Sequence, residues 1–131
     1  MWRILCVDDD GDSREILEII LQNADPHYNI ETVSSAKDAM TSISARPSDL
    51  YIIDYWMPDI DGAELCRWIR RTGSVTPILI FSAAAYRSDR DKLIKAGADE
   101  YLPKPTGIRD IEATVARLLK ASMVFRSADR N

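Results

Sequence analysis

One stretch of the sequence decides the fold, and it runs Asp49-Leu50-Tyr51-Ile52-Ile53-Asp54-Tyr55-Trp56-Met57-Pro58-Asp59-Ile60-Asp61-Gly62. Residues 50–53 form a short run rich in apolar and β-branched side chains, which is typical of a strand buried on both faces of a parallel sheet. The residue after such a strand lies at the carboxyl edge, where open parallel sheets bind their ligands. Asp54 alone would also suit an ordinary turn, so its meaning depends on what the other strands bring to that edge.

Strand-like and helix-like patterns alternate five times along the chain. They predict strands over residues 3–7, 28–33, 50–54, 77–81 and 99–102, and helices over 12–22, 35–45, 62–71, 88–96 and 107–121. This alternation requires parallel strands with right-handed crossovers, so the sequence predicts an α/β fold with helices on both faces of one sheet. The strand at 28–33 alternates apolar and polar residues, which places it at or near an edge. We expect Asp12 to cap the first helix, since Glu15 follows three residues later.

Length and composition indicate a single domain. The chain has 131 residues, of which 46% are hydrophobic and 29% charged, and this suits one core with little room for a second. We expect the domain to occupy residues 1–121 and residues 122–131 to form a tail or the start of a linker. The net charge of -4 argues against direct nucleic-acid binding by this domain.

Cysteine use and hydropathy predict a cytoplasmic protein. Cys6 and Cys66 lie far apart with no second cysteine or histidine nearby, so both are expected to be reduced and buried. No apolar run approaches the roughly 20 residues that a helix needs to cross a bilayer. Residues 1–7 enter a strand pattern at once, which is unlike a signal peptide.

Four of the five predicted strands end in a residue that can do chemistry. Asp8 and Asp9 follow the first strand, Asp54 the third, Ser82 the fourth and Lys104 the fifth. Two like charges 4 Å apart repel by about 4 kcal/mol at an effective dielectric of about 20, so three clustered acids need a cation or a raised pKa. Oxygen ligands without histidine or cysteine favour Mg²⁺, with Mn²⁺ as a second possibility, over zinc.

The remaining two residues suit a phosphoryl group. Lys104 supplies a positive charge, and the Ser82 hydroxyl can donate a hydrogen bond to a phosphate oxygen. Together with a nucleophilic carboxylate and a metal, they make a site for a phosphoryl group bound to an aspartate.

Four motifs resemble those of the receiver domain of two-component response regulators, namely Val7-Asp8-Asp9-Asp10, Asp54 with Met57-Pro58 and Asp61-Gly62, Phe81-Ser82-Ala83, and Tyr101-Leu102-Pro103-Lys104-Pro105. No single motif is specific, but the four in this order and spacing are, and the match runs from residue 3 to about residue 121. The resemblance implies a flavodoxin-like, doubly wound sheet of five parallel strands in the order 2-1-3-4-5.

The resemblance also implies a metal site and an acceptor. Asp54 would accept the phosphoryl group. Asp9 and Asp54 would bind Mg²⁺ directly, together with the backbone carbonyl of Trp56. Asp8 would bind mainly through a metal-bound water. Trp56 itself is bulkier than most residues two positions after the acceptor, and we hypothesise that its ring screens the acyl phosphate from water.

A second group of residues would carry the response. Ser82 would receive a phosphoryl oxygen, Lys104 would pair with the acyl phosphate, and Tyr101 would turn inward as an aromatic switch. The Lys104–Pro105 peptide is expected to be cis. Thr106 departs from the phenylalanine common after Lys-Pro in DNA-binding members, which weakens the case for their dimer through helix four, strand five and helix five.

These roles define a signalling switch. A sensor histidine kinase or a histidine phosphotransfer protein would donate to Asp54, and the surface of helix four, strand five and helix five would then control an unknown output domain or protein. A homodimer is possible. The domain's own chemistry would be phosphoacceptance and slow self-dephosphorylation rather than that of a dedicated enzyme.

Two other functions remain open from the sequence. Residues 8–11 contain a DxDG that resembles the start of the Mg²⁺-dependent haloacid dehalogenase phosphatases, with Asp8 as the nucleophile, although Asp12 stands where that motif has Thr or Ser. A receiver-like module that binds partners without phosphorylation is the other alternative. A calcium loop starting at Asp8 fails, because Ser13 stands at the position of the sharp-turn glycine and Ile19 at that of the bidentate glutamate.

Overall fold

The computed structural model describes the backbone of residues 1–83 and 87–129, and the side chains of these residues other than 87, 88 and 124–129. Strands and helices alternate as predicted: β1 (Trp2–Val7), α1 (Gly11–Ala24), β2 (Tyr28–Val33), α2 (Ala36–Ala45), β3 (Leu50–Ile53), α3 (Gly62–Arg71), β4 (Ile78–Ser82), α4 (Arg87–Ala96), β5 (Glu100–Pro103) and α5 (Ile108–Asp129).

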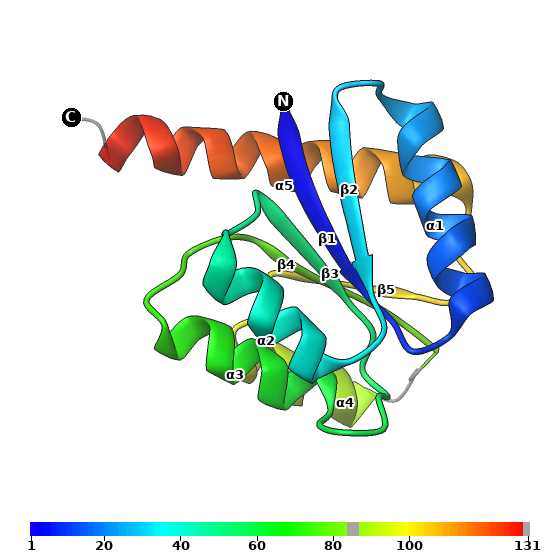
Figure 1. Cartoon of the computed structure of the whole chain (residues 1–131), viewed down its shortest axis with the longest axis vertical. Coiled ribbons are helices and arrows are strands. Elements are labelled where there is room, and N and C mark those ends of the chain that lie inside the picture. The colour runs from blue at the N-terminus through cyan, green and yellow to red at the C-terminus, as the bar shows by residue number, and fades with distance from the viewer. Residues whose placement is uncertain (84–86, 130–131) are drawn as a thin grey trace.

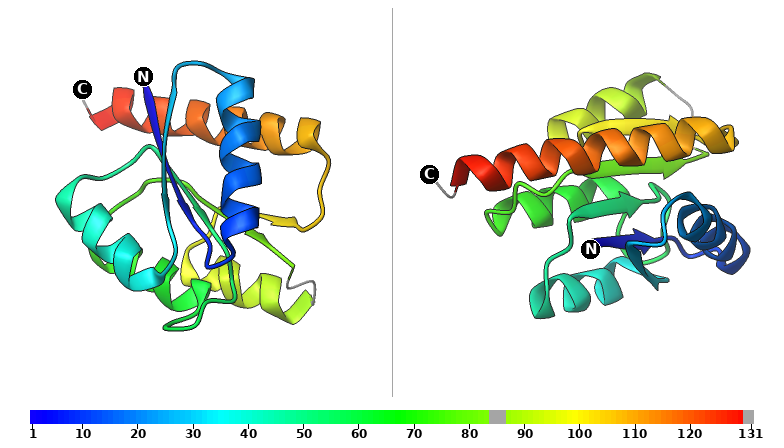
Figure 2. Two further views of the ribbon diagram at one scale, coloured as in Figure 1. Left: turned by 45° about the vertical axis from the view of Figure 1, so that its right-hand side comes forward. Right: turned by 90° about the horizontal axis from the view of Figure 1, so that it is seen from above.

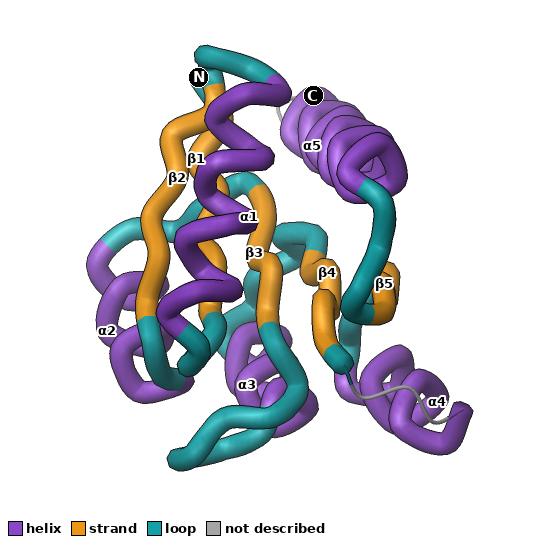
Figure 3. The backbone as a smooth tube through the Cα atoms, turned by 90° about the vertical axis from the view of Figure 1, so that its right-hand side faces the viewer, coloured by secondary structure: helices purple, strands orange, loops and turns teal. Residues whose placement is uncertain are grey.

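The strands form one parallel sheet in the order β2-β1-β3-β4-β5, as expected (Figure 1). Helices α1 and α5 cover one face, and α2, α3 and α4 cover the other (Figures 2 and 3). The order reverses between β1 and β3, so the loops after these two strands diverge at the carboxyl edge and leave space there for a ligand.

Alternate residues of the central strands serve two separate cores. In β1, Leu5 and Val7 pack toward α2, α3 and α4, whereas Ile4 and Cys6 pack toward α1 and α5. This is why β1 and β3 lack the polar alternation of a half-exposed strand. Cys6 is buried in one core and Cys66 in the other, and burial raises the pKa of both thiols to about 12.

The two edge strands carry the sequence features expected of edges. β2 alternates between exposed and half-buried residues over most of its length. β5 ends at Pro103, whose missing N–H is tolerated because β5 has a single neighbour, β4. The Lys104–Pro105 peptide that follows is cis, as the resemblance implied.

Two sequence-based boundaries are wrong. The N-cap of α1 is Asp10, whose carboxylate accepts the backbone N–H of Asp12, so Asp12 lies inside the helix and is not its cap. Helix α5 does not end at Ala121 but continues to Asp129, and its last turns project past the sheet (Figure 1). Residues 122–129 are therefore helical, while residues 130 and 131 of the expected tail lie outside the described part.

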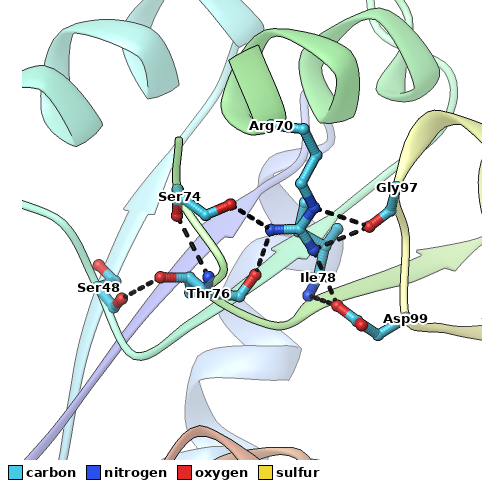
Figure 4. Close-up of polar contacts among 7 residues, drawn as sticks. All are labelled: Ser48, Arg70, Ser74, Thr76, Ile78, Gly97 and Asp99. Atoms are coloured by element: carbon cyan, nitrogen blue, oxygen red, sulfur yellow. Dashed lines mark hydrogen bonds and ion pairs between the residues drawn. The ribbon is translucent and has the colours of Figure 1, made fainter. Parts of the chain in front are cut away.

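The Arg70 side chain forms a network of hydrogen bonds at the edge of the sheet where the strands begin (Figure 4). From the last turn of α3, its guanidinium donates to the carbonyls of Ser74, Thr76 and Gly97 at 2.8–3.1 Å, and to the Asp99 carboxylate at 3.0 Å. This single side chain ties the loop before β4 to the loop before β5, at the opposite end of the sheet from the predicted site. Within the described residues, no helix has both the length and the apolar character needed to cross a bilayer.

Candidate functional site

The three predicted acids meet at the carboxyl edge. Carboxylate oxygens of Asp8, Asp9 and Asp54 all lie within 4.8 Å of one another. Their convergence follows from the pairing of β1 with β3, because the Asp54 N–H donates to the Val7 carbonyl at 2.9 Å and brings the two strand ends into line.

Asp54 is held in a poorly solvated position. Burial raises its pKa, and the charge of Asp8 acts in the same direction. A hydrogen bond from Ser82, the charge of Lys104 and the backbone N–H of Tyr55 oppose this effect without cancelling it. The pKa of Asp54 is therefore above its ordinary value, so its surroundings disfavour the anion and a bound cation would stabilise it.

Lys104 follows β5, an edge strand of the sheet, and its side chain extends to Asp8 at the end of β1. Its Nζ donates to Asp8 Oδ2 at 2.6 Å and to Ser13 Oγ at 2.7 Å. Burial raises the pKa of Asp8, but hydrogen bonds from Lys104, from the Asp10 N–H and from Ser13 outweigh this and hold it below its ordinary value. Lys104 thus compensates Asp8 most directly and Asp54 at longer range.

Ser82 and Tyr101 lie together on β4 and β5. Ser82 is fully buried and bonds to Asp54, and the Tyr101 hydroxyl donates to the Ser82 carbonyl at 3.3 Å. The Tyr101 ring is already turned into the protein, with 7% of the residue exposed and Arg90 stacked over it at 5.5 Å. The side chain of Tyr101 is therefore linked to the backbone of the residue that carries the predicted hydroxyl.

The loop after Asp54 is pinned at both ends. At Gly62 a Cβ would lie 2.7 Å from the Asp54 carbonyl oxygen, so only glycine allows α3 to start this close to the end of β3. Asp61 caps α3 by accepting the Glu64 N–H. Asp59 accepts the N–H groups of Ala36 at 3.3 Å and Lys37 at 2.9 Å, and so caps α2 from a different segment of the chain.

The aromatic residues after Asp54 connect the site to α4. Trp56 is 60% exposed, and its ring meets that of the buried Tyr55 edge to face, with centroids 4.7 Å apart. The Tyr55 hydroxyl accepts a hydrogen bond from Lys92 of α4 at 3.1 Å, and Lys92 also lies 3.9 Å from Asp61. The segment next to Asp54 is therefore in direct contact with α4.

The donor set fits Mg²⁺. Three carboxylates converge with no histidine or thiol among them, and hard oxygen donors of this kind suit Mg²⁺ or Mn²⁺. Asp9 is exposed, so an ion can enter from solvent. Asp9 and Asp54, with the Trp56 backbone carbonyl, are the groups that would hold it.

Sequence reasoning found the acids, the hydroxyl, the lysine and the aromatic side chain, but missed two contacts. Ser13 bonds to Lys104, 91 residues away in the chain, and Lys92 bonds to Tyr55, 37 residues away. A signal for Ser13 existed, because the first turn of α1 lies directly after the acid pair at the same edge of the sheet.

Comparison with known proteins agrees with this geometry. A model of the response regulator receiver domain matches residues 4–116. The response regulator MprA of Mycolicibacterium vanbaalenii is 38% identical over 118 residues, which cover 90% of this chain and 50% of that protein. MprA of Mycobacterium leprae is 37% identical over the same length and share of this chain. The chain thus spans about half the length of these relatives.

Solved structures show the same fold. A CheY-like receiver domain protein from Methanospirillum hungatei JF-1 superposes with a TM-score of 0.87 at 25% identity, covering 94% of this chain and 97% of that one. A two-component response regulator from Clostridium difficile gives a TM-score of 0.86 at 25% identity, covering 92% and 97%. The chain belongs to the receiver domain family of two-component response regulators.

Proposed function

We propose that this domain accepts a phosphoryl group on Asp54 from a phosphohistidine of a sensor kinase or a phosphotransfer protein. The observation that supports this most directly is the convergence of Asp8, Asp9 and Asp54 with Lys104 beside them. A carboxylate oxygen of Asp54 attacks phosphorus in line with the histidine nitrogen, the P–N bond breaks, and an acyl phosphate forms.

The surrounding residues have separate tasks in this transfer. Asp9, Asp54 and the Trp56 carbonyl would hold Mg²⁺, with Asp8 close by, and the ion would supply charge neutralisation for the transferring oxygens. Lys104 pairs with one phosphoryl oxygen. The Ser82 hydroxyl, now bonded to Asp54, donates to another. Slow self-hydrolysis then resets the domain.

The response passes through contacts that already join the site to its surroundings. Ser82 and Tyr101 are linked through the Ser82 carbonyl, so a shift of Ser82 toward a phosphoryl oxygen changes the support under the Tyr101 ring. Arg90 of α4 stacks on that ring. The surface of α4, β5 and α5 is thereby biased between two states and controls an output domain or protein, with homodimerisation as one way to do so.

The face beside the site suits a protein donor. A groove of about 260 Å³ opens next to Lys104 and is lined mainly by apolar side chains, among them Ile16 and Ile20 of α1 and Ile111 of α5. On the same helix, Ile16 is 58% exposed and Ile19 is 50% exposed. An apolar rim at a phosphoryl site favours a partner protein over a small phosphorylated metabolite. A cytoplasmic location accords with the two free, buried cysteines.

The haloacid dehalogenase-like alternative is less well supported. Its nucleophile would be Asp8, but the Asp8 carboxylate is 9% exposed and bonds to Lys104 and Ser13. Asp54 has no cationic partner as close as this among the described contacts. The module that works without phosphorylation would leave the whole acid cluster without a task.

Labelling with acetyl phosphate in the presence of Mg²⁺ tests the proposal. Wild-type protein should acquire a phosphate that is stable in acid and labile in base, and Asp54→Ala should not. Asp12→Ala, which changes an exposed acid of α1, serves as the matched control and should label normally. An unlabelled wild type would refute the proposal, and label kept in Asp54→Ala but lost in Asp8→Ala would support the phosphatase instead.

A further inference from the structure

Lys104 has a second hydrogen-bond acceptor beside Asp8, and it is Ser13 in the first turn of α1. The ammonium donates to Ser13 Oγ at 2.7 Å and to Asp8 Oδ2 at 2.6 Å. The Ser13 hydroxyl is also hydrogen-bonded to the Asp8 carboxylate. A hydroxyl can accept from an ammonium while donating its own proton to a carboxylate, so the three side chains form a closed ring of hydrogen bonds.

The hydrogen bond to Ser13 matters because the attraction between Asp8 and Lys104 depends on the charge of the acid cluster. Asp8 belongs to the acid cluster, and its pull on Lys104 weakens whenever a cation joins that cluster. The Ser13 hydroxyl is neutral, so its hydrogen bond to the ammonium persists whatever charge the cluster carries. The Phe81 ring also lies near the ammonium, with its centre 5.2 Å away, but it offers no directional hydrogen bond of this kind.

We propose that Ser13 is a positioning residue for Lys104. Its hydroxyl holds the ammonium at the rim of the acid cluster, oriented to meet a phosphoryl oxygen on Asp54. The idea rests on the proposed function, in which Lys104 pairs with the acyl phosphate. Ser13 needs no contact with the phosphoryl group, because it acts through the lysine.

A pair of matched substitutions tests this role. Ser13→Thr keeps the hydroxyl, and Ser13→Val has nearly the shape of threonine without it; both share the small cost of β-branching in a helix. Loss of one charge-assisted hydrogen bond should slow acetyl-phosphate labelling of Asp54 about five- to tenfold in Ser13→Val, whereas Ser13→Thr should stay within about twofold of wild type. Ser13→Ala also removes the hydroxyl, but it introduces a strong helix former. It should slow labelling to the same extent as Ser13→Val.

A matched control and a spectroscopic readout separate positioning from general damage. Ser42→Val removes an exposed hydroxyl of α2 that donates a hydrogen bond to Glu31, and this change should leave labelling unchanged. The ¹⁵N-labelled ammonium of Lys104 should give a slowly exchanging NMR signal in wild type and Ser13→Thr, and should lose that protection in Ser13→Val and Ser13→Ala.

Equal labelling rates for the valine and threonine variants would overturn the proposal. So would a Lys104 ammonium signal that Ser13→Val and Ser13→Ala leave unchanged. The NMR measurement needs no phosphoryl donor, so it decides the positioning role even if the wild type takes up no phosphate, which would refute the proposed function and not the contact.

Discussion

Trp56 is the most unusual residue of the predicted site, because it is bulkier than most residues at this position in the family. Its ring is largely exposed and rests against that of Tyr55, the residue that follows Asp54. We predict that Trp56→Ala or Trp56→Asn shortens the half-life of the acyl phosphate severalfold, because water then approaches Asp54 more freely. Phosphorylated protein, freed of donor and followed over time by gel shift, gives the half-life.

Val75→Ala is the control, because it changes an exposed apolar residue at the other end of the sheet. An unchanged half-life in the Trp56 variants would contradict the screening hypothesis.

Asp59 should stabilise the fold in a pH-dependent way. Its slight burial raises the pKa, but the N–H groups of Lys37, Ile60 and Ala36 lower it below the ordinary value. A depressed pKa means that the stabilisation is present above the unfolded value of about 3.9 and is lost as pH falls through the folded value. Asp59→Ala should therefore cost about 0.5–1 kcal/mol at pH 7 and less below about pH 4.

Urea unfolding at both pH values measures this difference. Asp59→Asn is the matched control, because its amide oxygen can still accept one of the two N–H groups of α2 but does not titrate. It should retain part of the stability at pH 7 and show less pH dependence than wild type. A cost of Asp59→Ala that is the same at both pH values would rule out the linkage.

Residue roles were predictable where the chemistry is local in the sequence. Asp8 and Asp9 follow one buried strand and Asp54 another, and strand pairing alone brings them together. The capping of α2 by Asp59 was not predictable, because its partners lie 22 and 23 residues away and depend on how the loop folds back. Asp10 replaced Asp12 as the cap of α1 because both acids can cap, and only the backbone geometry chooses between them.

At the scale of elements, Gly97 is the point where α4 meets the Arg70 network. Its φ is +113°, and a Cβ there would lie 2.6 Å from Arg70 Cγ. Gly73 also has a positive φ, +88°, but a Cβ there would meet nothing within 4 Å. We predict that Gly97→Ala costs about 2–4 kcal/mol and Gly73→Ala about 1 kcal/mol, because only the first displaces Arg70 from its hydrogen bonds.

Urea unfolding of the two variants makes the comparison directly. Adding Arg70→Ala to each variant forms a double-mutant cycle. The coupling should be large with Gly97→Ala, since the clash is gone once Arg70 is shortened, and near zero with Gly73→Ala. Equal costs for the two glycines would show that the backbone angle alone matters.

The strands were the easiest elements to predict and the end of α5 the hardest. Buried parallel strands appear as short apolar runs, and each predicted strand lies within about a residue of the observed one. Beyond Ala121 the sequence mixes small, charged and apolar residues, so no periodic face marks a continuing helix. The helix nevertheless runs to Asp129, without a glycine or proline to end it.

At the scale of the whole molecule, the acid cluster should lower stability until a cation neutralises it. Burial and the charge of Asp8 both raise the pKa of Asp54, so its ionised form at pH 7 opposes folding, and this penalty falls as pH drops toward that pKa. Asp54→Asn should therefore be more stable than wild type without metal, by on the order of 1 kcal/mol. Mg²⁺ should stabilise wild type by about 1.4 kcal/mol at tenfold its Kd and leave Asp54→Asn nearly unchanged.

Thermal unfolding with MgCl₂ or with NaCl at equal ionic strength measures both effects. Asp38→Asn, at an acid in the first turn of α2 that is not part of the cluster, should respond to Mg²⁺ as wild type does. Stabilisation of Asp54→Asn by Mg²⁺ equal to that of wild type would mean that the ion binds elsewhere.

The length of α5 has a geometric consequence for any protein built onto this domain. An α-helix advances 1.5 Å and turns 100° with each residue, and the last turns of α5 already extend past the sheet (Figure 1). If a module were fused after Asp129 as a continuation of this helix, α5 would set two things. One is the distance of the module from the domain, and the other is the direction in which the module faces around the helix axis. Inserting one residue after Ala121 would rotate such a module by about 100°, whereas inserting seven would return it to nearly its original facing, about 10 Å farther away.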